Sequence, residues 1–358
     1  MSTAVAATRR SPSSALTRFV VASRYLPVYV AIALLLVVAA IWAPEALRAP
    51  SLRAIAPFGT FLAIAALGQM LVIMTGGIDL SVPGTFTLAA VVTVGVGDAS
   101  DERIWTAIGV ALVACALVGL VNGILIGGLG LNALIVTLAV GQIVNGIAVR
   151  YYTGVAIQTP VPEGLSAWTS ARFFGVTRTF WVGVALTAVL IVIFRYTTIG
   201  RRFQVVGANP TASWIAGLRV NLNQVSAYVV AAVCFGLAGI LLAAFLKTPS
   251  ISIGVPYLLG PIAAVVIGGA SLTGGLASPL STWAGAMFLA GLNQMMRVMG
   301  LSTALQFVVF GLVIIGGMLV SGDRIIRGVE QVLRERRRPA PVDVASEQAV
   351  SHQAGPQP

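Results

Sequence analysis

Charged side chains and histidine are scarce in this chain. Only 9% of its 358 residues are charged, and the single histidine, His352, stands in the C-terminal tail. A soluble domain carries roughly 25% charged residues, so an arrangement of soluble domains is excluded. Metal-assisted hydrolysis and nucleophilic catalysis need histidines, paired carboxylates or a nucleophile beside a base, and the apolar part of the chain lacks these sets. We therefore expect no catalytic residue, no metal site and no cofactor.

A phosphate-binding loop is missing as well. The glycine-rich segment GGASLTGG, residues 268–275, has no Lys-Ser or Lys-Thr pair after its glycines. That pair reaches the nucleotide phosphates and Mg²⁺ in a P-loop, so the chain cannot hydrolyse ATP by that route. Cysteine is rare too. Cys115 and Cys234 both stand inside apolar runs, which is typical of small packing residues and implies no disulfide framework.

Long apolar runs are what the chain does have. Hydrophobic residues make up 58% of it, and about 20 apolar residues span a bilayer as a helix. The pattern predicts an all-α, polytopic membrane protein of about ten transmembrane helices. The predicted spans are residues 27–43, 54–75, 82–97, 104–126, 131–149, 179–196, 223–246, 257–270, 280–296 and 302–320. Together they form a transmembrane domain over residues 27–320. The spans at 82–97 and 257–270 are short, which favours neighbouring loops that dip into the membrane.

Arginines are grouped in three places: the N-terminal segment 1–26, the loop 197–222 and the tail 321–358. With an even number of spans all three lie on one side, which the positive-inside rule makes the cytoplasm. Both termini are then cytoplasmic and residues 150–178 external. We expect the basic tail to be partly disordered, because it is rich in Pro, Ala, Ser and Gln. Membrane lipid is the expected surrounding. Nucleic acid is not an expected partner, because the basic residues are divided among separate loops.

Asp79 is the one carboxylate at membrane level. It follows Gly76 and Gly77 and precedes Ser81 and Pro83 in the segment Leu67 to Val92. An ionisable group between apolar runs is costly, so it marks a functional candidate. A structural interpretation has at least equal weight: the glycines end one helix, and Asp79 or Ser81 caps the next. The pattern recurs weakly at residues 268–273, which indicates either paired interrupted helices of a transport pathway or chance.

Uncharged amides also stand in or beside the apolar runs. They are Gln69, Asn122, Asn132, Gln142, Asn145, Asn293 and Gln294. Most such residues cross-link helices, but they also offer the donors and acceptors that an uncharged polar solute needs. The predicted substrate pathway consists of Gln69, Asp79, Ser81, Asn132, Gln142 and Asn145. Gln142 and Asn145 share one helix face, which is the preferred pathway wall. Gly119, Gly123 and Gly127, at four-residue spacing, indicate close helix packing.

The loop 197–222 contains a short helix of its own. Asn209 suits the N-cap, Pro210 the first helical position, and Gly217 the stop. Two turns are too short to be stable alone, so this helix packs on a partner. One alternative is the membrane surface, with Trp214 and Ile215 as anchors. The other is a soluble motor subunit that grips the loop.

Four segments together carry a family resemblance. They are GQMLVIMTGGIDLSV at 68–82, NALIVTLAVGQIVNGI at 132–147, GRRFQVVGANPTASWIAGLRV at 200–220 and IAAVVIGGASLTGG at 262–275. The chain resembles the membrane permease of ATP-binding-cassette (ABC) importers for monosaccharides of the ribose, xylose and galactose type. The likeness covers residues 50–320 or nearly so. Two departures concern the choice of sugar: Pro83 follows the GGIDLSV pattern, and Leu259-Gly260-Pro261 stands where the family often has an acidic residue.

The resemblance implies that the chain translocates a monosaccharide across the bacterial cytoplasmic (inner) membrane, powered by a separate cytoplasmic ATPase. An external sugar-binding protein and a second permease copy or paralogue are the other implied partners. The loop residues implied to couple to the ATPase are Gly207, Asn209, Pro210, Ala212, Ser213 and Gly217. The alternative is an ion-coupled secondary transporter of a small polar solute. That class needs several ionisable groups at mid-membrane, and only Asp79 qualifies.

Overall fold

The computed structural model describes residues 13–156 and 159–321. Residues 1–12 of the predicted N-terminal segment and the predicted tail from residue 322 lie outside the described residues. The helices are α1 (Ser13–Trp42), α2 (Ala49–Met74), α3 (Val82–Gly97), α4 (Ile104–Gly123), α5 (Ala133–Tyr151), α6 (Glu163–Ser170), α7 (Arg178–Tyr196), α8 (Thr198–Ala208), α9 (Pro210–Ile215), α10 (Val220–Leu246), α11 (Gly260–Ile267), α12 (Pro279–Val298) and α13 (Thr303–Ser321). The described part is thus a helical membrane protein, as predicted.

Each of the ten predicted spans coincides with one long or apolar helix. Six helices of the described part are long and apolar enough to cross a membrane. They are α1, α2, α4 together with the turns on either side of it, α5, α7 and α10. Three shorter apolar helices fall at Val82–Gly97, Val255–Ile267 and Ala304–Gly317. The tenth, α12, has 20 residues and carries Asn293, Gln294 and Arg297. The two spans predicted to be short are indeed short.

Helix α2 is the centre around which the others pack. In the most apolar stretch of this helix, 94% of the residues are buried. The helix packs against α7, α10, α11 and α12. Small residues make this possible: Gly68 faces the backbone of Ala231 on α10, and Gly59 faces Met287 on α12. Without a hydrophobic driving force between helices in lipid, such close backbone approach supplies much of the association energy.

The glycine stripe on α4 packs as its spacing predicts. Gly119 faces the backbone of Tyr228, Gly123 faces Val225, and Gly127 at the following π-helical turn faces Gln224. A Cβ at any of these positions would lie within 3.0 Å of α10. The stripe therefore sets the distance between α4 and α10.

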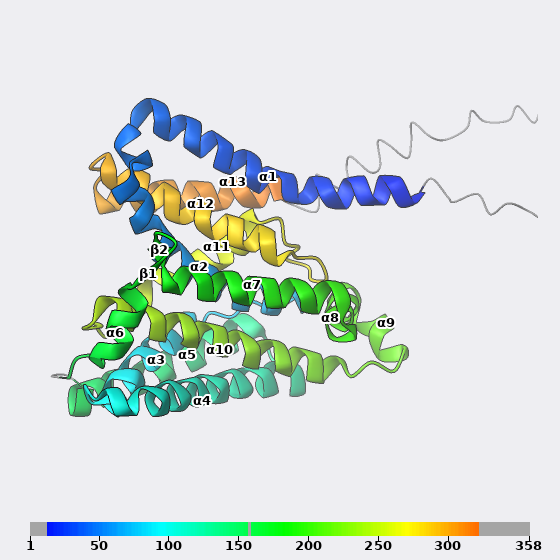
Figure 1. Ribbon diagram of the computed structural model, residues 1–358. Helices are drawn as coiled ribbons and strands as arrows, with labels where there is room; N and C mark the ends of the chain where they lie inside the picture. Colours follow the sequence, from blue (N-terminus) through cyan, green and yellow to red (C-terminus); the bar gives the residue numbers. More distant parts are fainter. Residues whose placement is uncertain (1–12, 157–158, 322–358) are drawn as a thin grey trace, which may run out of the picture. The chain divides into compact units, whose positions relative to one another are not determined.

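The helices run between two ends of the bundle (Figure 1). The end that carries α8 and α9, at the right of the figure, is called the coupling end here. The end that carries α6 and the strands β1 (Arg172–Phe173) and β2 (Val176–Thr177) is called the opposite end. Helix α2 runs toward the coupling end and α12 away from it. The C-terminal half of α2 and the N-terminal half of α12 therefore lie toward the coupling end, and their other halves lie toward the opposite end.

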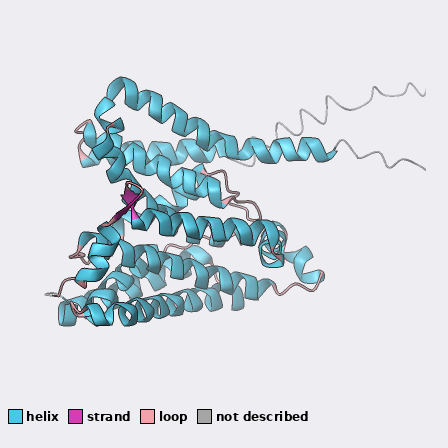
Figure 2. Ribbon diagram, viewed as in Figure 1, coloured by secondary structure: helices cyan, strands magenta, loops and turns pink. Residues whose placement is uncertain are grey.

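Two features differ from the sequence-based expectation. Helix α1 begins at Ser13, so part of the predicted N-terminal segment is already helical. The segment predicted as the external loop 150–178 contains α6 and a short antiparallel hairpin, in which Arg172 pairs with Thr177 and Phe173 with Val176. Figure 2 shows this hairpin as the strand pair of the described residues. Its turn contains Phe174 and Gly175, both at positive φ, which no apolar periodicity reveals.

Candidate functional site

The coupling loop forms two helices whose ends follow local sequence signals. The Oδ1 atom of Asn209 accepts a hydrogen bond from the backbone N–H of Ala212 at 2.9 Å, and Pro210 occupies the first turn of α9. Gly217 adopts φ +80°, and its N–H donates to the carbonyl of Trp214 at 2.9 Å. Cap, start and stop of α9 are therefore confirmed as predicted.

The coupling loop is fixed to the bundle at one junction. Gly207, near the end of α8, lies against the carbonyl of Met74 at the end of α2 and against Gly275. The N–H of Gly275 donates to that same Met74 carbonyl at 2.9 Å. Any side chain at Gly207 would force these groups apart. A displacement of α8 therefore acts directly on the end of α2 and on the loop that contains Gly275.

Buried and exposed residues divide the predicted coupling set. Ser213 is 1% exposed and donates from Oγ to the carbonyl of Val205 at 3.1 Å, which ties α9 to α8. Gly207 is buried as well. Because neighbouring backbone covers both residues, they fix α8 and α9 in place, and their role in coupling to an ATPase stays a prediction. Asn209, Pro210, Ala212 and Gly217 are exposed.

The outermost side chains of α9 are large and apolar. Trp214 is 72% exposed and Ile215 is 74% exposed. Together these two side chains form a small apolar surface on α9, the helix that Ser213 ties to α8. Its cover is either lipid or a partner, the two alternatives that the sequence leaves open.

Two helices end in similar glycine turns. Helix α2 ends with Gly76 at φ +84°, and Gly77 donates back to the carbonyl of Val72 at 3.2 Å. Helix α11 ends in the same way, with Gly269 at φ +83° and Ala270 donating to Val265 at 3.2 Å. Both are Schellman turns, which glycine favours because it adopts positive φ without strain. The internal sequence echo thus corresponds to two equivalent helix stops, offset by one residue.

Asp79 is fully buried behind the first of these turns. Its Oδ1 atom accepts from the Ser81 N–H at 2.8 Å and from the Ser81 Oγ at 2.6 Å. The side-chain amide of Gln69, oriented to satisfy both of its groups, pairs with the Asp79 backbone: the nitrogen donates to the carbonyl at 3.1 Å and the oxygen accepts from the N–H at 3.0 Å. Asp79 therefore organises the start of α3 and does not face a solute in this conformation.

Two further helices hold the same loop. On α4, Asn122 Nδ2 donates to Ser81 Oγ at 3.0 Å. On α5, Thr137 Oγ1 accepts from the Leu80 N–H at 2.9 Å. Asn122 stands out in the sequence as an intramembrane amide. Nothing in the sequence identifies Thr137, because a threonine inside an apolar helix usually bonds only its own helix, as Thr137 also does to Ala133 at 2.7 Å.

Three buried atoms of this cluster have no hydrogen-bond partner among the described residues: Asp79 Oδ2, Asn122 Oδ1 and Tyr228 Oη. Each such atom costs about 1–3 kcal/mol of folding free energy. Close packing keeps them in place, since Tyr228 Oη lies directly against Gly77. Sequence reasoning missed Tyr228, because a tyrosine in an apolar run also fits an interface anchor.

The predicted pathway set therefore divides into a buried group and an outer group. Gln69, Asp79 and Ser81 are fully buried. Asn132 is exposed and caps α5, accepting from the N–H groups of Leu134 at 3.0 Å and Ile135 at 3.3 Å. Gln142 is exposed and Asn145 half-buried on α5. Their contact with a solute stays a prediction, and α5 is the helix on which it rests.

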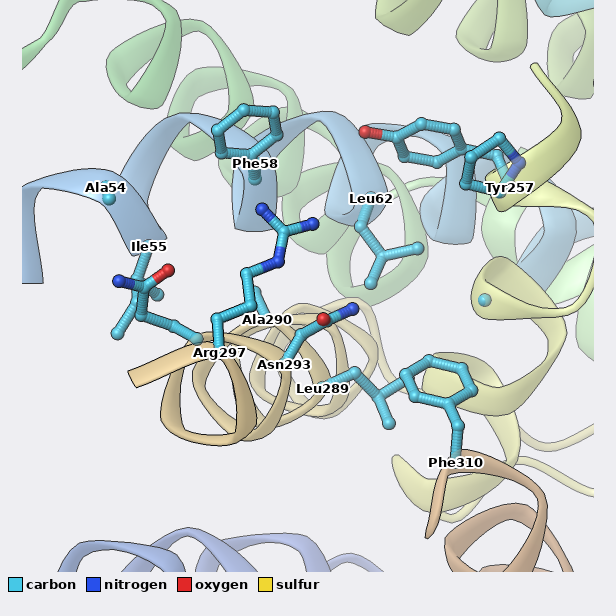
Figure 3. Close-up of a pocket in the computed structure, with 13 residues that line it drawn as sticks. Ala54, Ile55, Phe58, Leu62, Tyr257, Leu289, Ala290, Asn293, Arg297 and Phe310 are labelled. Carbon is cyan, nitrogen blue, oxygen red and sulfur yellow. The ribbon is translucent and has the colours of Figure 1, made fainter. Parts of the chain in front are cut away.

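The described part has a cavity at each end of the bundle. A cavity of about 500 Å³ is open at the coupling end, and its lining includes Gly76, Gly77, Asn221, Gln224 and Tyr228. Another, of about 130 Å³, lies between α2 and α12 toward the opposite end. Figure 3 shows its lining, which includes Phe58 on α2 and Asn293 and Arg297 on α12.

A mainly helical bundle with interrupted helices, a capped loop helix at one end and cavities at both ends is typical of a membrane transport permease. The chain belongs to the permease family described as "Branched-chain amino acid transport system / permease component", whose model matches residues 51–318. The resemblance to ABC importer permeases is thereby confirmed at the level of the family.

Three of the similar proteins are named for sugars. The chain is 32% identical to the ribose import permease protein RbsC of Escherichia coli K12 over 266 residues, which cover 73% of this chain and 82% of the relative. It is 29% identical to the L-arabinose transport system permease protein AraH of the same strain, over 81% and 88% of the two chains. The L-arabinose ABC transporter permease protein AraH of Azospirillum brasilense is 31% identical over 70% and 74%. No solved structure matches the chain.

Proposed function

We propose that the protein is the membrane-spanning subunit of an ABC importer and that its cargo is a monosaccharide. The observation that carries the proposal is the junction of Gly207 with Met74 and Gly275. A force on α8 would move the end of α2 and the loop between α11 and α12 together, because both contact Gly207. The relatives named for ribose and L-arabinose supply the cargo class. The energy comes from ATP hydrolysis on a partner, which stabilises one of the two access states.

A cytoplasmic ATPase is the proposed cover of Trp214 and Ile215. The hydrogen bonds of Asn209 and Ser213 hold α9 in place. The exposed side chains on this helix can therefore transmit a force from the ATPase to α8. A second permease copy or paralogue completes the pathway, with the outer face of α5 as the proposed wall. An external sugar-binding protein delivers cargo to the opposite end.

Charge supports the orientation. Every acidic side chain of the described residues except Asp79 lies at the opposite end: Glu45, Asp98, Asp101, Glu102 and Glu163. Arg201, Arg202 and Arg219 lie at the coupling end without an acidic neighbour in the described part. The positive-inside rule counts Lys and Arg, most of which stand in residues 1–26, 197–222 and 321–358, whereas Arg48, Arg103 and Arg150 are among those at the opposite end. This excess favours a cytoplasmic coupling end, in the inner membrane of a bacterium.

The family description makes a branched-chain amino acid the competing cargo. A zwitterion needs both an anionic and a cationic partner in its path. The outer face of α5 offers the amides Gln142 and Asn145 and no acidic side chain, which suits hydroxyl groups better. Uptake of labelled ribose, L-arabinose and leucine in cells that co-express the ATPase decides between them. Uptake of leucine alone would overturn the sugar proposal.

Coupling is tested by Ala212→Glu, a bulky charge on the exposed side of α9. The permease should remain in the membrane. Either the ATPase should no longer co-purify with it, or the assembled complex should hydrolyse ATP without sugar uptake. Gly109→Ala, at a position with open space around it on α4, is the control and should leave both activities intact. A fully assembled and active Ala212→Glu protein would exclude this loop from coupling. Uptake that continues without the ATPase would favour the ion-coupled alternative.

Topology is tested with one exposed cysteine at each end. Cys115 and Cys234 are buried, so labelling reports the new thiol. Ser170→Cys on α6 should react with an impermeant reagent in intact cells, and Ala216→Cys after α9 only in inverted vesicles. The reverse pattern would contradict the proposed orientation.

A further inference from the structure

The cavity at the opposite end is built inside one subunit. It lies between α2, α12, α13 and the segment Pro256–Gly260, and its volume is about 130 Å³. Pockets for drug-sized ligands occupy about 300–1,000 Å³, so this one admits only a small solute or a small group. Tyr257 contributes to its lining and is held in place by stacking on Phe86, with ring centroids 4.5 Å apart.

Two facing walls of this cavity differ in chemistry. On α12, Asn293, Gln294 and Arg297 line it at positions that share one helix face. On α2, the lining consists of Ala54, Ile55, Phe58 and Leu62. Figure 3 shows Arg297 and Asn293 extending from α12 and Phe58 on the facing helix. The cavity is therefore polar on one side and apolar, with one aromatic ring, on the other.

The polar wall has unused hydrogen-bonding capacity. No hydrogen bond or ion pair joins the side chains of Asn293, Gln294 or Arg297 to another residue of the described part. No acidic residue lines the cavity. Amides offer both donors and acceptors, and a guanidinium offers five donors in a rigid plane, so this wall can bind several hydroxyl groups at once.

We infer that this cavity is a binding site for a single monosaccharide, with its hydroxyl edge on Asn293 and Arg297 and its C–H face on Phe58. The inference rests on the proposed function and adds a site to it. A sugar ring is polar around its edge and weakly positive over its C–H groups, which the negative face of an aromatic ring attracts. A phospholipid fits less well, because its polarity runs from one end to the other, whereas the cavity is polar across its width.

The place of the site suits the first contact of an imported solute. Leu62 precedes Met74 by twelve residues of α2, or roughly 18 Å along the helix axis. The sugar would thus bind closer to the opposite end of the bundle than the junction of Gly207 and Met74. Both places lie on α2, so a movement of this helix reaches the cavity and the coupling loop together.

A cysteine inside the cavity tests the site without the external binding protein. Ala54→Cys, in membrane vesicles that contain the assembled transporter, is alkylated with the uncharged reagent N-ethylmaleimide, with and without ribose or L-arabinose. Sugar at about three times its Kd leaves roughly a quarter of the sites free and slows alkylation about fourfold. Adding Asn293→Leu or Arg297→Gln should abolish this protection.

Two controls make the result specific. Arg53→Gln removes a cation at the same end that does not line the cavity, and should leave protection intact. Ser170→Cys, outside the cavity, should be alkylated at one rate with or without sugar. A phospholipid occupant would leave Ala54→Cys insensitive to sugar. An unprotected Ala54→Cys in a transporter that imports the same sugar overturns the site but not the proposed function. A transporter that imports neither sugar overturns both.

Discussion

The Asp79 loop, residues 75–81, and the second glycine loop, residues 268–278, begin alike and are anchored differently. Both follow a Schellman turn at a glycine with φ near +84°. The Asp79 loop is then held by buried side chains of three helices, Gln69, Asn122 and Thr137. In the second loop the Ser271 N–H donates to the Leu276 carbonyl at 2.8 Å, and the hydroxyls of Ser271 and Thr273 lie 2.8 Å apart. Arg24 Nε donates to the Gly269 carbonyl at 2.7 Å.

The difference separates a fixed element from a movable one. Side chains that converge from α2, α4 and α5 tie the Asp79 loop to the bundle core. The second loop meets the coupling loop directly, at Gly275 and Ala208. A force on α8 should therefore displace the second loop more easily than the Asp79 loop. Variants in each loop can break or sharpen this contrast.

The largest effect is expected from Asp79→Leu. It removes the acceptor of the Ser81 N–H and Oγ, and each buried group left unpaired costs about 1–3 kcal/mol. Thermal unfolding of the purified permease should show the loss, together with a loss of uptake. Asp79→Asn keeps an acceptor oxygen and should cost less. Leu272→Ala, in the second loop, shortens a side chain that is 37% exposed and should cost the least. An equal loss from all three variants would refute the contrast.

Gly207→Ala should come next. A Cβ there meets the Met74 carbonyl and the Gly275 N–H, and overpacking of this kind costs about 1–3 kcal/mol. Because the backbone of the second loop is the easier to displace, uptake should fall while the thermal stability of the core changes less. Alanine favours a helix over glycine by about 1 kcal/mol, so a more stable and fully active variant would show that the junction is loose.

A smaller and directly comparative effect is expected at the two glycine turns. Alanine at either Gly76 or Gly269 must adopt positive φ, at a cost of about 1–2 kcal/mol. A Cβ at Gly76 has only the Thr273 carbonyl within 4 Å, at 3.9 Å, whereas one at Gly269 lies 2.5 Å from the Arg24 carbonyl. Gly269→Ala should therefore lower the unfolding temperature more than Gly76→Ala. The reverse order would mean that the Arg24 contact is easily displaced.

The smallest effect is expected from Tyr228→Phe. The Tyr228 hydroxyl is buried without a partner in the described part, so its removal relieves a desolvation cost of about 1–3 kcal/mol and loses no hydrogen bond. Thermal stability should stay the same or rise slightly, and uptake should be retained. A marked loss of uptake would assign the hydroxyl a role in the transport cycle.

Much of the fold follows from local sequence. Spans such as 82–97 agree with α3 to the residue, because a long apolar helix is the one way to satisfy the backbone in lipid. The ends of α9 are equally local, since Asn209, Pro210 and Gly217 act on neighbouring peptide groups. The start of α1 and the hairpin at 172–177 were not predictable, because no apolar period marks them.

The candidate sites were predicted less completely. Asp79 and Gln69 are conspicuous as polar residues in apolar surroundings, yet the sequence groups them with Gln142 in one pathway. The structure separates them, because Asp79 is fully buried and Gln142 exposed. Likewise Ser213 reads as a small contact residue, but its hydroxyl faces α8. Orientation around a helix axis depends on which neighbours cover each face, and that is not a local property.

By itself, the sequence determined that the chain is a helical membrane protein, where its helices stop and which loop has a helix of its own. Those features depend on apolar length, proline and glycine, and each acts within a few residues. Only the tertiary structure decided that Gly207 meets Met74 and Gly275, that Asn122 and Thr137 hold the Asp79 loop, and that Phe58 and Asn293 line one cavity. These pairs lie far apart in the chain, and only the packing of α2 against its neighbours brings them into contact.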